Sequence, residues 1–216
     1  MAHLYANTSS IIAKSISIRK SDISSPNSSA QIISERQTPI KIDFDELYNN
    51  RFKEIYSQIL EYLINASLNA KKDDLNKYMD IRRSALLLAE ALKDMKNVQP
   101  NIYKFMTSTN PYAKAEYDKL RIKMLHGLRV IEKMQSLKLG DKEGLAELRA
   151  LREEYRSISL EPDALLEEKK ISNKMATSMI NDIEIIKGIT KKLVKIVEIS
   201  LSHKDDELSN LVIQNL

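Results

Sequence analysis

The sequence predicts an all-α fold: an elongated up-and-down helical bundle with a flexible N-terminal tail. Glycine and proline are scarce, at 4 and 5 residues, so turns and β-hairpins lack their usual residues. Apolar residues recur three or four positions apart over long stretches, which is the spacing of a helix that packs on one side. The longest stretch, 162–202, would span roughly 60 Å at about 1.5 Å per residue, more than a compact domain of this size needs.

The chain divides near residue 42. Residues 1–42 are rich in serine, which dilutes their isoleucines below the density that a packed core needs, so we expect a flexible tail or linker. The alternative is a short amphipathic helix on a membrane or partner surface, with its basic residues near lipid phosphates. Residues 43–204 form the predicted bundle, and residues 205–216 a C-terminal tail.

The first two helices of the bundle are predicted from acidic start signals. The first begins at Asp43 or Asp45, and the second at Asp73 or Asp74. A carboxylate at these positions can accept hydrogen bonds from the free N–H groups of the first turn. Apolar residues follow at core spacing in both helices, and Tyr62 is among those that we expect to point inward.

Pro100 interrupts the second helix. Because proline has no N–H to donate to the preceding turn, we expect a kink there rather than a restart. Asn110 followed by Pro111 is a strong start signal for the third helix, with a capping side chain before a proline at the first helical position. This helix should end at Gly140, and Asp141 then caps a short fourth helix.

Glu161 and Pro162 open the last and longest predicted helix. A polar strip interrupts its apolar side, formed by Asn173, Ser178, Asn181 and Asp182. Buried polar side chains need hydrogen-bond partners, so the strip would fix the register of the helix inside the bundle or contact another chain. An exposed strip with neither role is an equally open alternative.

Composition and charge exclude several classes of protein. The 34 basic and 30 acidic residues are intermixed, so the net charge of +4 is a small surplus and does not indicate a nucleic-acid partner. Cysteine is absent, which fits a cytoplasmic location. No run of apolar residues approaches the roughly 18 that a membrane-spanning helix requires, so we do not expect this chain to span a membrane.

Nothing in the sequence indicates catalysis. The histidines at positions 3, 126 and 203 are isolated, and none belongs to the Glu-x-x-His pair that a di-iron bundle uses twice. There is no Gly-x-Ser-x-Gly string and no glycine-rich phosphate loop. We therefore expect a protein that is not an enzyme and has no cofactor.

Three strings between residues 80 and 202 resemble a known family: 89–96, 116–121 and 175–182. They are similar to the PhoU-like cytoplasmic domain that follows the membrane domain in bacterial sodium/phosphate (Na/Pi) cotransporters. The resemblance implies a cytoplasmic module that acts in phosphate transport or its regulation, at the inner face of the membrane, through contact with a transporter membrane domain. That membrane domain is missing from the sequence, so a fragment of a longer transporter and a stand-alone protein both remain open.

The same resemblance implies a metal site. PhoU-like bundles carry a Glu/Asp-x-x-x-Asp motif associated with metal clusters, and its counterpart here is Glu90 with Asp94. Carboxylates four residues apart share a helix face, so they can converge on one divalent or ferric ion if a second helix adds oxygen ligands. The alternative is a solvated pair that Lys93, Arg83 or a neighbouring helix neutralises.

Three functions follow, in order of preference. The first is the regulatory module of a sodium-dependent phosphate transporter. The second is a structural adaptor or oligomerisation protein, for which a homo-dimer is the simplest form. The third is a carboxylate metal-binding bundle built on Glu90 and Asp94.

Overall fold

The computed structural model describes residues 1–68, 70–136, 142–156 and 161–214. These stretches contain helices and no strand, which confirms the all-α prediction. The helices are α1 (Ala2–Ser15), α2 (Lys20–Ile23), α3 (Ser29–Glu35), α4 (Phe44–Leu47), the π-helix η1 (Tyr48–Lys53), α5 (Glu54–Ser67), α6 (Lys72–Met106), α7 (Pro111–Ser136), α8 (Lys142–Arg156), α9 (Pro162–Glu167) and α10 (Asn173–Gln214). The boundaries predicted at Gly140 and Asp141 lie outside the described residues.

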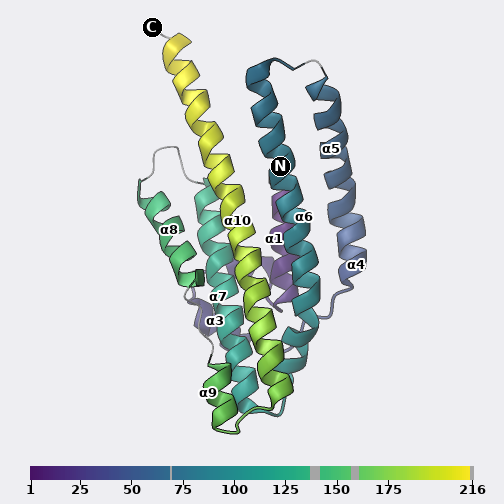
Figure 1. Cartoon of the computed structure of the whole chain (residues 1–216), viewed down its shortest axis with the longest axis vertical. Helices are drawn as coiled ribbons and strands as arrows, with labels where there is room; N and C mark the ends of the chain where they lie inside the picture. The colour runs from purple at the N-terminus through teal and green to yellow at the C-terminus, as the bar shows by residue number, and fades with distance from the viewer. Residues whose placement is uncertain (69, 137–141, 157–160, 215–216) are drawn as a thin grey trace.

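The long helices α6, α7 and α10 form the centre of an elongated up-and-down bundle (Figure 1). α10 packs on both α6 and α7, and α8 packs on α7 and α10. α1 and α5 pack on α6, while α2 and α3 lie against α7. The core draws fully buried apolar side chains from the three central helices, including Leu88, Phe105, Leu120 and Ile186.

Capping hydrogen bonds confirm two of the predicted helix starts. Asp43 Oδ1 accepts a hydrogen bond from the N–H of Glu46 at 2.9 Å, at the start of α4. Asn110 Oδ1 accepts from the N–H groups of Tyr112 and Ala113, both at 3.0 Å, at the start of α7. In both cases a side-chain oxygen satisfies backbone donors that have no partner within the helix.

α6 runs unbroken from Lys72 to Met106 and passes through Pro100. The helix does not restart after this proline. Ile102 and Phe105, which follow it, are fully buried, so the core on both sides of Pro100 keeps the backbone helical. Packing therefore outweighs the loss of one backbone hydrogen bond at the proline.

The last predicted helix is divided in the structure, because the chain turns between α9 and α10. Lys169 has a left-handed backbone with φ of 56°, and the N–H groups of Lys169 and Lys170 bond back to carbonyls of α9. Ser172 then caps the first turn of α10. No glycine or proline marks this turn, so the apolar spacing of the sequence predicted one continuous helix across it. At its other end α10 continues to Gln214, so residues 205–214 extend the helix instead of forming a separate tail.

Residues 1–42 depart from the predicted flexible tail. They contain α1, α2 and α3, and Ile11, Ile12 and Ile16 are at most 1 % exposed. Some of the serines that favoured disorder are satisfied locally: the hydroxyl of Ser15 donates to the carbonyl of Ile11 at 2.8 Å. The isoleucines therefore face the bundle, not a membrane or partner surface, because α6 supplies the apolar surface that this segment lacks alone.

Arg121 of α7 is fully buried and holds this N-terminal segment in place. Its Nε donates to the carbonyl of Ile16 at 3.0 Å and its Nη2 to the carbonyl of Arg36 at 2.5 Å. Its Nη1 donates to Asp118 Oδ1 at 2.6 Å. Burial lowers the pKa of Arg121, and the ion pair with Asp118 partly offsets that effect. The planar guanidinium thus joins two loops to one helix.

Arg129, two turns further along α7, fastens the loop between α2 and α3. It donates to the carbonyls of Asp22 at 2.8 Å, Asn27 at 2.7 Å and Ser25 at 3.1 Å. The carboxylate of Asp22 pairs with Arg36 at 3.0 Å. Burial raises the pKa of Asp22, but the hydrogen bonds from Arg36 and from the N–H of Arg19, together with the charges of both arginines, outweigh burial and lower that pKa. The N-terminal segment is therefore held mainly through its backbone.

α8 approaches α7 closely at Gly127. The hydroxyl of Tyr155 donates to the carbonyl of Lys123 at 2.5 Å. A Cβ atom at position 127 would lie 2.7 Å from that hydroxyl oxygen. The close approach of the two helices therefore requires a residue without a side chain at this position.

Candidate interaction surface

The two residues predicted to bind a metal lie half-buried on α6. Asp94 Oδ2 pairs with Nζ of Lys192 on α10 at 2.6 Å, so a neighbouring helix neutralises it. Within the described stretches, no group of three or more His, Cys, Asp or Glu side chains is placed to hold a metal ion. Those stretches bring no third ligand to Glu90 and Asp94, and the ion pair with Lys192 favours, for Asp94, the alternative of a carboxylate that a neighbouring helix neutralises.

The predicted polar strip separates into exposed and buried members: exposed Asn173 and Asn181, half-buried Ser178, and buried Asp182. Asp182 Oδ2 accepts hydrogen bonds from the hydroxyl of Tyr117 on α7 at 2.6 Å and from the amide of Asn101 on α6 at 2.9 Å. The ring of Tyr117 stacks on Phe105, with centroids 4.3 Å apart. Asp182 therefore joins the three central helices, which is the register role expected for the strip.

Burial gives Asp182 an unusual titration. Burial raises its pKa above the ordinary 3.8, and the hydrogen bonds from Tyr117 and Asn101 only partly oppose this. The folded protein therefore binds the proton more tightly than the unfolded chain. The stabilising contribution of Asp182 is full below about pH 3.8 and is lost as the pH rises through the raised pKa.

We expect the free energy of unfolding of Asp182→Asn at neutral pH to be at most about 1 kcal/mol below that of the wild type, or above it. The amide oxygen of asparagine can still accept both hydrogen bonds, and it carries no charge that burial would penalise. Asp182→Ala should lower it by about 1–3 kcal/mol, because the Tyr117 hydroxyl and the Asn101 amide lose their partner. Urea unfolding of the three proteins over a pH series measures both effects. A difference between wild type and Asp182→Asn that stays constant with pH would contradict the assigned titration.

Large exposed apolar side chains gather on the hairpin of α5 and α6. Five of them are between 49 and 76 % exposed: Tyr62, Ile64, Leu68, Met79 and Leu86. The others in the described residues are scattered over α1, α7 and α10, and none is more than 43 % exposed. Since scattered single residues are normal on a protein surface and clusters are not, the hairpin is the distinctive part of this surface.

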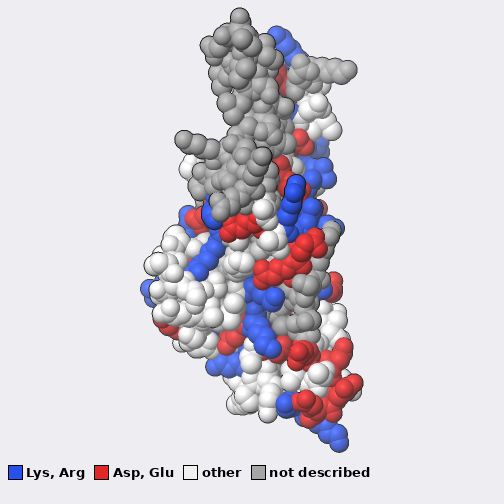
Figure 2. Space-filling view, turned by 90° about the vertical axis from the view of Figure 1, so that its left-hand side faces the viewer, with Lys and Arg blue, Asp and Glu red and all other residues white. Residues whose placement is uncertain are grey.

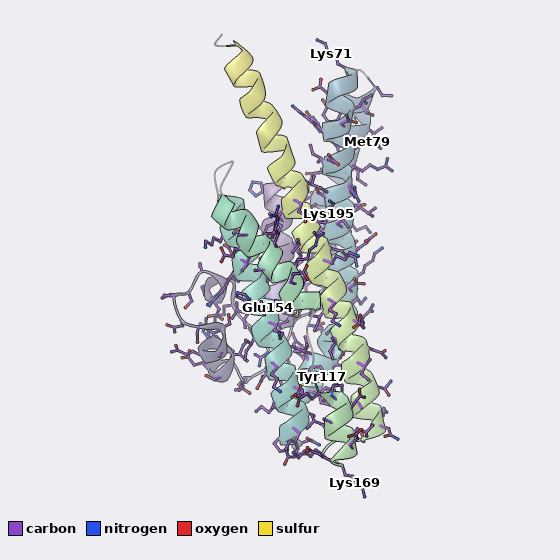
Figure 3. All side chains as sticks on the ribbon, turned by 60° about the vertical axis from the view of Figure 1, so that its left-hand side comes forward. Lys71, Met79, Tyr117, Glu154, Lys169 and Lys195 are labelled. Carbon is purple, nitrogen blue, oxygen red and sulfur yellow. The ribbon has the colours of Figure 1, made fainter. Side chains whose placement is uncertain are left out.

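Four of these residues, two on each helix, are named the hairpin surface: Ile64, Leu68, Met79 and Leu86. Ile64 and Leu68 are four residues apart on α5, and Met79 and Leu86 are seven apart on α6, so each pair shares a helix side. Figure 3 labels Met79 in the upper part of α6. In Figure 1 this part of the hairpin rises above the N-terminus of α1.

A groove of about 370 Å³ runs along the hairpin. It is lined by Leu60, Leu63, Ile64, Ser67, Leu75, Tyr78, Met79 and Arg82. Its walls are mostly leucine, isoleucine, tyrosine and methionine from two antiparallel helices. A groove of this shape and chemistry suits the apolar side of another helix.

Charged residues flank the hairpin surface with opposite signs on its two helices. On α5, exposed Glu61 precedes Ile64 by three residues and lies on the same side of the helix. On α6, exposed Arg82 and Arg83 follow Met79 by three and four residues. Half-buried Asp80 also lies beside Met79 on α6, so the α5 edge is acidic and the α6 edge carries a net basic charge.

A second groove, of about 350 Å³, lies between α8 and α10 and is lined partly by Arg152, Lys187 and Lys191. Two of these basic residues are already neutralised: Lys187 by Glu184 at 2.7 Å, and Arg152 by Glu198 at 3.3 Å. Figure 2 shows acidic and basic side chains intermixed on this side of the molecule. This groove therefore gives a weaker indication of a binding site than the hairpin does.

Sequence reasoning missed the hairpin surface, although a signal was present. Tyr62, expected to point inward, is 67 % exposed. Between Ile55 and Ala70 the only charged residue is Glu61, and apolar residues occupy more than one side of the helix. A helix that is apolar over more than one stripe has more apolar surface than a single neighbour can cover.

Comparison of the chain with protein-family models, curated proteins and solved structures found no match. The similarity to the PhoU-like domain of sodium/phosphate cotransporters thus remains a prediction from the strings quoted above. In the part of the chain that the structure describes, no helix combines the length and apolarity needed to cross a lipid bilayer.

Proposed function

We propose that this protein is a non-catalytic helical module that works through protein–protein contacts made by the hairpin surface. The observation that carries the proposal is the gathering of Ile64, Leu68, Met79 and Leu86, 49 to 76 % exposed, on one hairpin, where Ile64 and Met79 also line an apolar groove. Exposed apolar clusters of this kind mark sites of association in soluble proteins. These side chains are in contact with solvent, so packing in the core does not account for their apolar character.

The process that we propose for the module is sodium-dependent phosphate transport or its regulation, in the cytoplasm at the inner face of the membrane. This part of the proposal depends on the sequence resemblance alone. Its partner would be the membrane domain of a transporter. Regulation then requires that the module bind one conformation of that domain more tightly than another, since equal binding to both shifts no equilibrium.

A strain in which Leu68 is replaced by glutamate, at the chromosomal locus, tests both parts. A charge at a buried contact opposes association, so we expect its phosphate uptake to match that of a strain deleted for the whole chain. Ile180→Glu is the matched control: Ile180 is an exposed isoleucine on α10, 43 % exposed and away from the hairpin, and its replacement should leave uptake unchanged.

The outcomes separate the two parts of the proposal. Unchanged uptake in the deletion strain would overturn the role in phosphate transport. If the deletion changes uptake but Leu68→Glu behaves as wild type, with normal helicity and protein level, the hairpin surface is not the contact.

A further inference from the structure

We infer that the occupant of the hairpin surface is the hairpin of a second copy of this chain, so that two hairpins pair about a two-fold axis into a four-helix bundle. This inference deepens the proposed function, because it names the first partner of the same surface.

The hairpin surface is complementary to itself in shape. A two-fold contact uses the same patch on both copies, so the patch must contain both a projecting part and a recess. Ile64 and Leu68 project from α5, with 64 and 76 % exposure. The adjoining groove reaches Leu75 and Tyr78 on α6. The projecting residues of each copy can therefore enter the groove of the other.

The apolar pattern suits a helical partner that runs antiparallel. Among the exposed and lining residues, one apolar row on α5 holds positions 60, 64 and 68, one turn apart, and one on α6 holds positions 75, 79 and 86. A turn-by-turn ladder on each helix is the pattern by which helices pack in four-helix bundles. Two paired hairpins would form such a bundle.

The charges of the hairpin surface are also complementary to themselves. A two-fold axis parallel to the helices sets α5 of one copy against α6 of the other, and these two helices run antiparallel. It then brings Glu61, on the acidic edge, to the Arg82 and Arg83 edge of the second copy, and does so twice. Opposite charges at the rim favour this arrangement over a two-fold axis perpendicular to the helices, which would set α5 against α5 and so bring like charges together.

Sedimentation velocity over a concentration series is the direct measurement, made on the purified full-length chain. We expect a dimer of the wild type that Leu68→Glu converts to monomer, with affinity lowered at least about a hundredfold because a charge enters an apolar contact. Ile180→Glu should leave the dimer unchanged. Since Leu68 is 76 % exposed, the variant should fold, and circular dichroism checks that.

A charge exchange tests the antiparallel arrangement. Glu61→Arg alone should weaken the dimer several-fold to about tenfold, the scale of exposed ion pairs. The triple variant E61R, R82E, R83E restores opposite charges across the contact and should recover wild-type affinity. A triple variant as weak as the single one would overturn the antiparallel arrangement.

Cysteine cross-linking locates the contact, and the chain is suited to it because it contains no cysteine. Ile64→Cys protein mixed with Met79→Cys protein should give a mixed disulfide dimer, whereas Ile180→Cys should give none. A wild-type protein that stays monomeric at high concentration, or dimers insensitive to Leu68→Glu, would overturn the inference. If hairpin variants nevertheless lose phosphate uptake, the proposed function stands and the occupant is a different protein.

Discussion

Replacing Arg121 by alanine is expected to release the N-terminal segment and to lower the free energy of unfolding by about 3–5 kcal/mol, the range for breaking a buried ion pair. The change leaves the Asp118 carboxylate without its 2.6 Å partner. It also leaves the carbonyls of Ile16 and Arg36 without the donors that satisfy them. Buried groups that lose their partners carry a desolvation penalty, so the loss exceeds that of ordinary packing.

Urea unfolding and hydrogen exchange together test this expectation. Amide protection should fall most in α1 and α3, because Arg121 contacts the loops that follow these helices. Arg121→Met, which keeps much of the volume but none of the donors, should lose almost as much stability. Arg149→Ala, at an exposed position on α8, is the control and should change stability by less than about 0.5 kcal/mol. If Arg121→Met had the same free energy of unfolding as the wild type, side-chain volume and not hydrogen bonding would be what matters at this site.

Gly127→Ala is expected to lower the free energy of unfolding by about 1–3 kcal/mol, as overpacking typically does. The added methyl group would lie 2.7 Å from the Tyr155 hydroxyl oxygen, which the carbonyl of Lys123 holds in place. The two helices must therefore separate, or the tyrosine must lose its hydrogen bond. Alanine would otherwise favour the helix, so a loss of stability identifies the close contact as its cause.

Gly188→Ala provides a matched control within the same protein. A Cβ atom there meets nothing nearer than Lys192 Nζ at 3.9 Å, so the helix propensity of alanine should raise stability by about 0.5–1 kcal/mol. A double-mutant cycle with Tyr155→Phe then isolates the contact, because removing the hydroxyl should recover part of the loss in Gly127→Ala. Equal effects of alanine at the two glycines would contradict the packing argument. Thermal unfolding is sufficient to rank the wild type and the four variants.

The helix starts at Asp43 and Asn110 could be predicted from the sequence because a capping side chain is a local signal. The turn at Lys169 could not, since its left-handed backbone is held without a glycine. The burial of residues 1–42 was also out of reach, because it depends on Arg121 and Arg129, which are distant in sequence. Within the segment itself only the serine content was visible, and it indicated disorder.

The polar strip and the apolar hairpin illustrate the same limit. The sequence identified Asp182 as a residue that needs partners, but its partners, Tyr117 and Asn101, come from two other helices. It gave no means to separate Asp182 from exposed Asn181. Likewise Tyr62 falls on the apolar spacing of α5, and only the relative positions of α1, α5 and α6 decide that it faces solvent.

The unbroken course of α6 has a mechanical consequence. One end of this helix carries Met79 on the hairpin, and near the other end Asn101 donates to buried Asp182. A continuous helix is stiff along its axis, so a tilt imposed at the hairpin moves the far end as a lever does. A force applied where the protein meets its neighbour would thus be carried along α6 towards the buried carboxylate of Asp182.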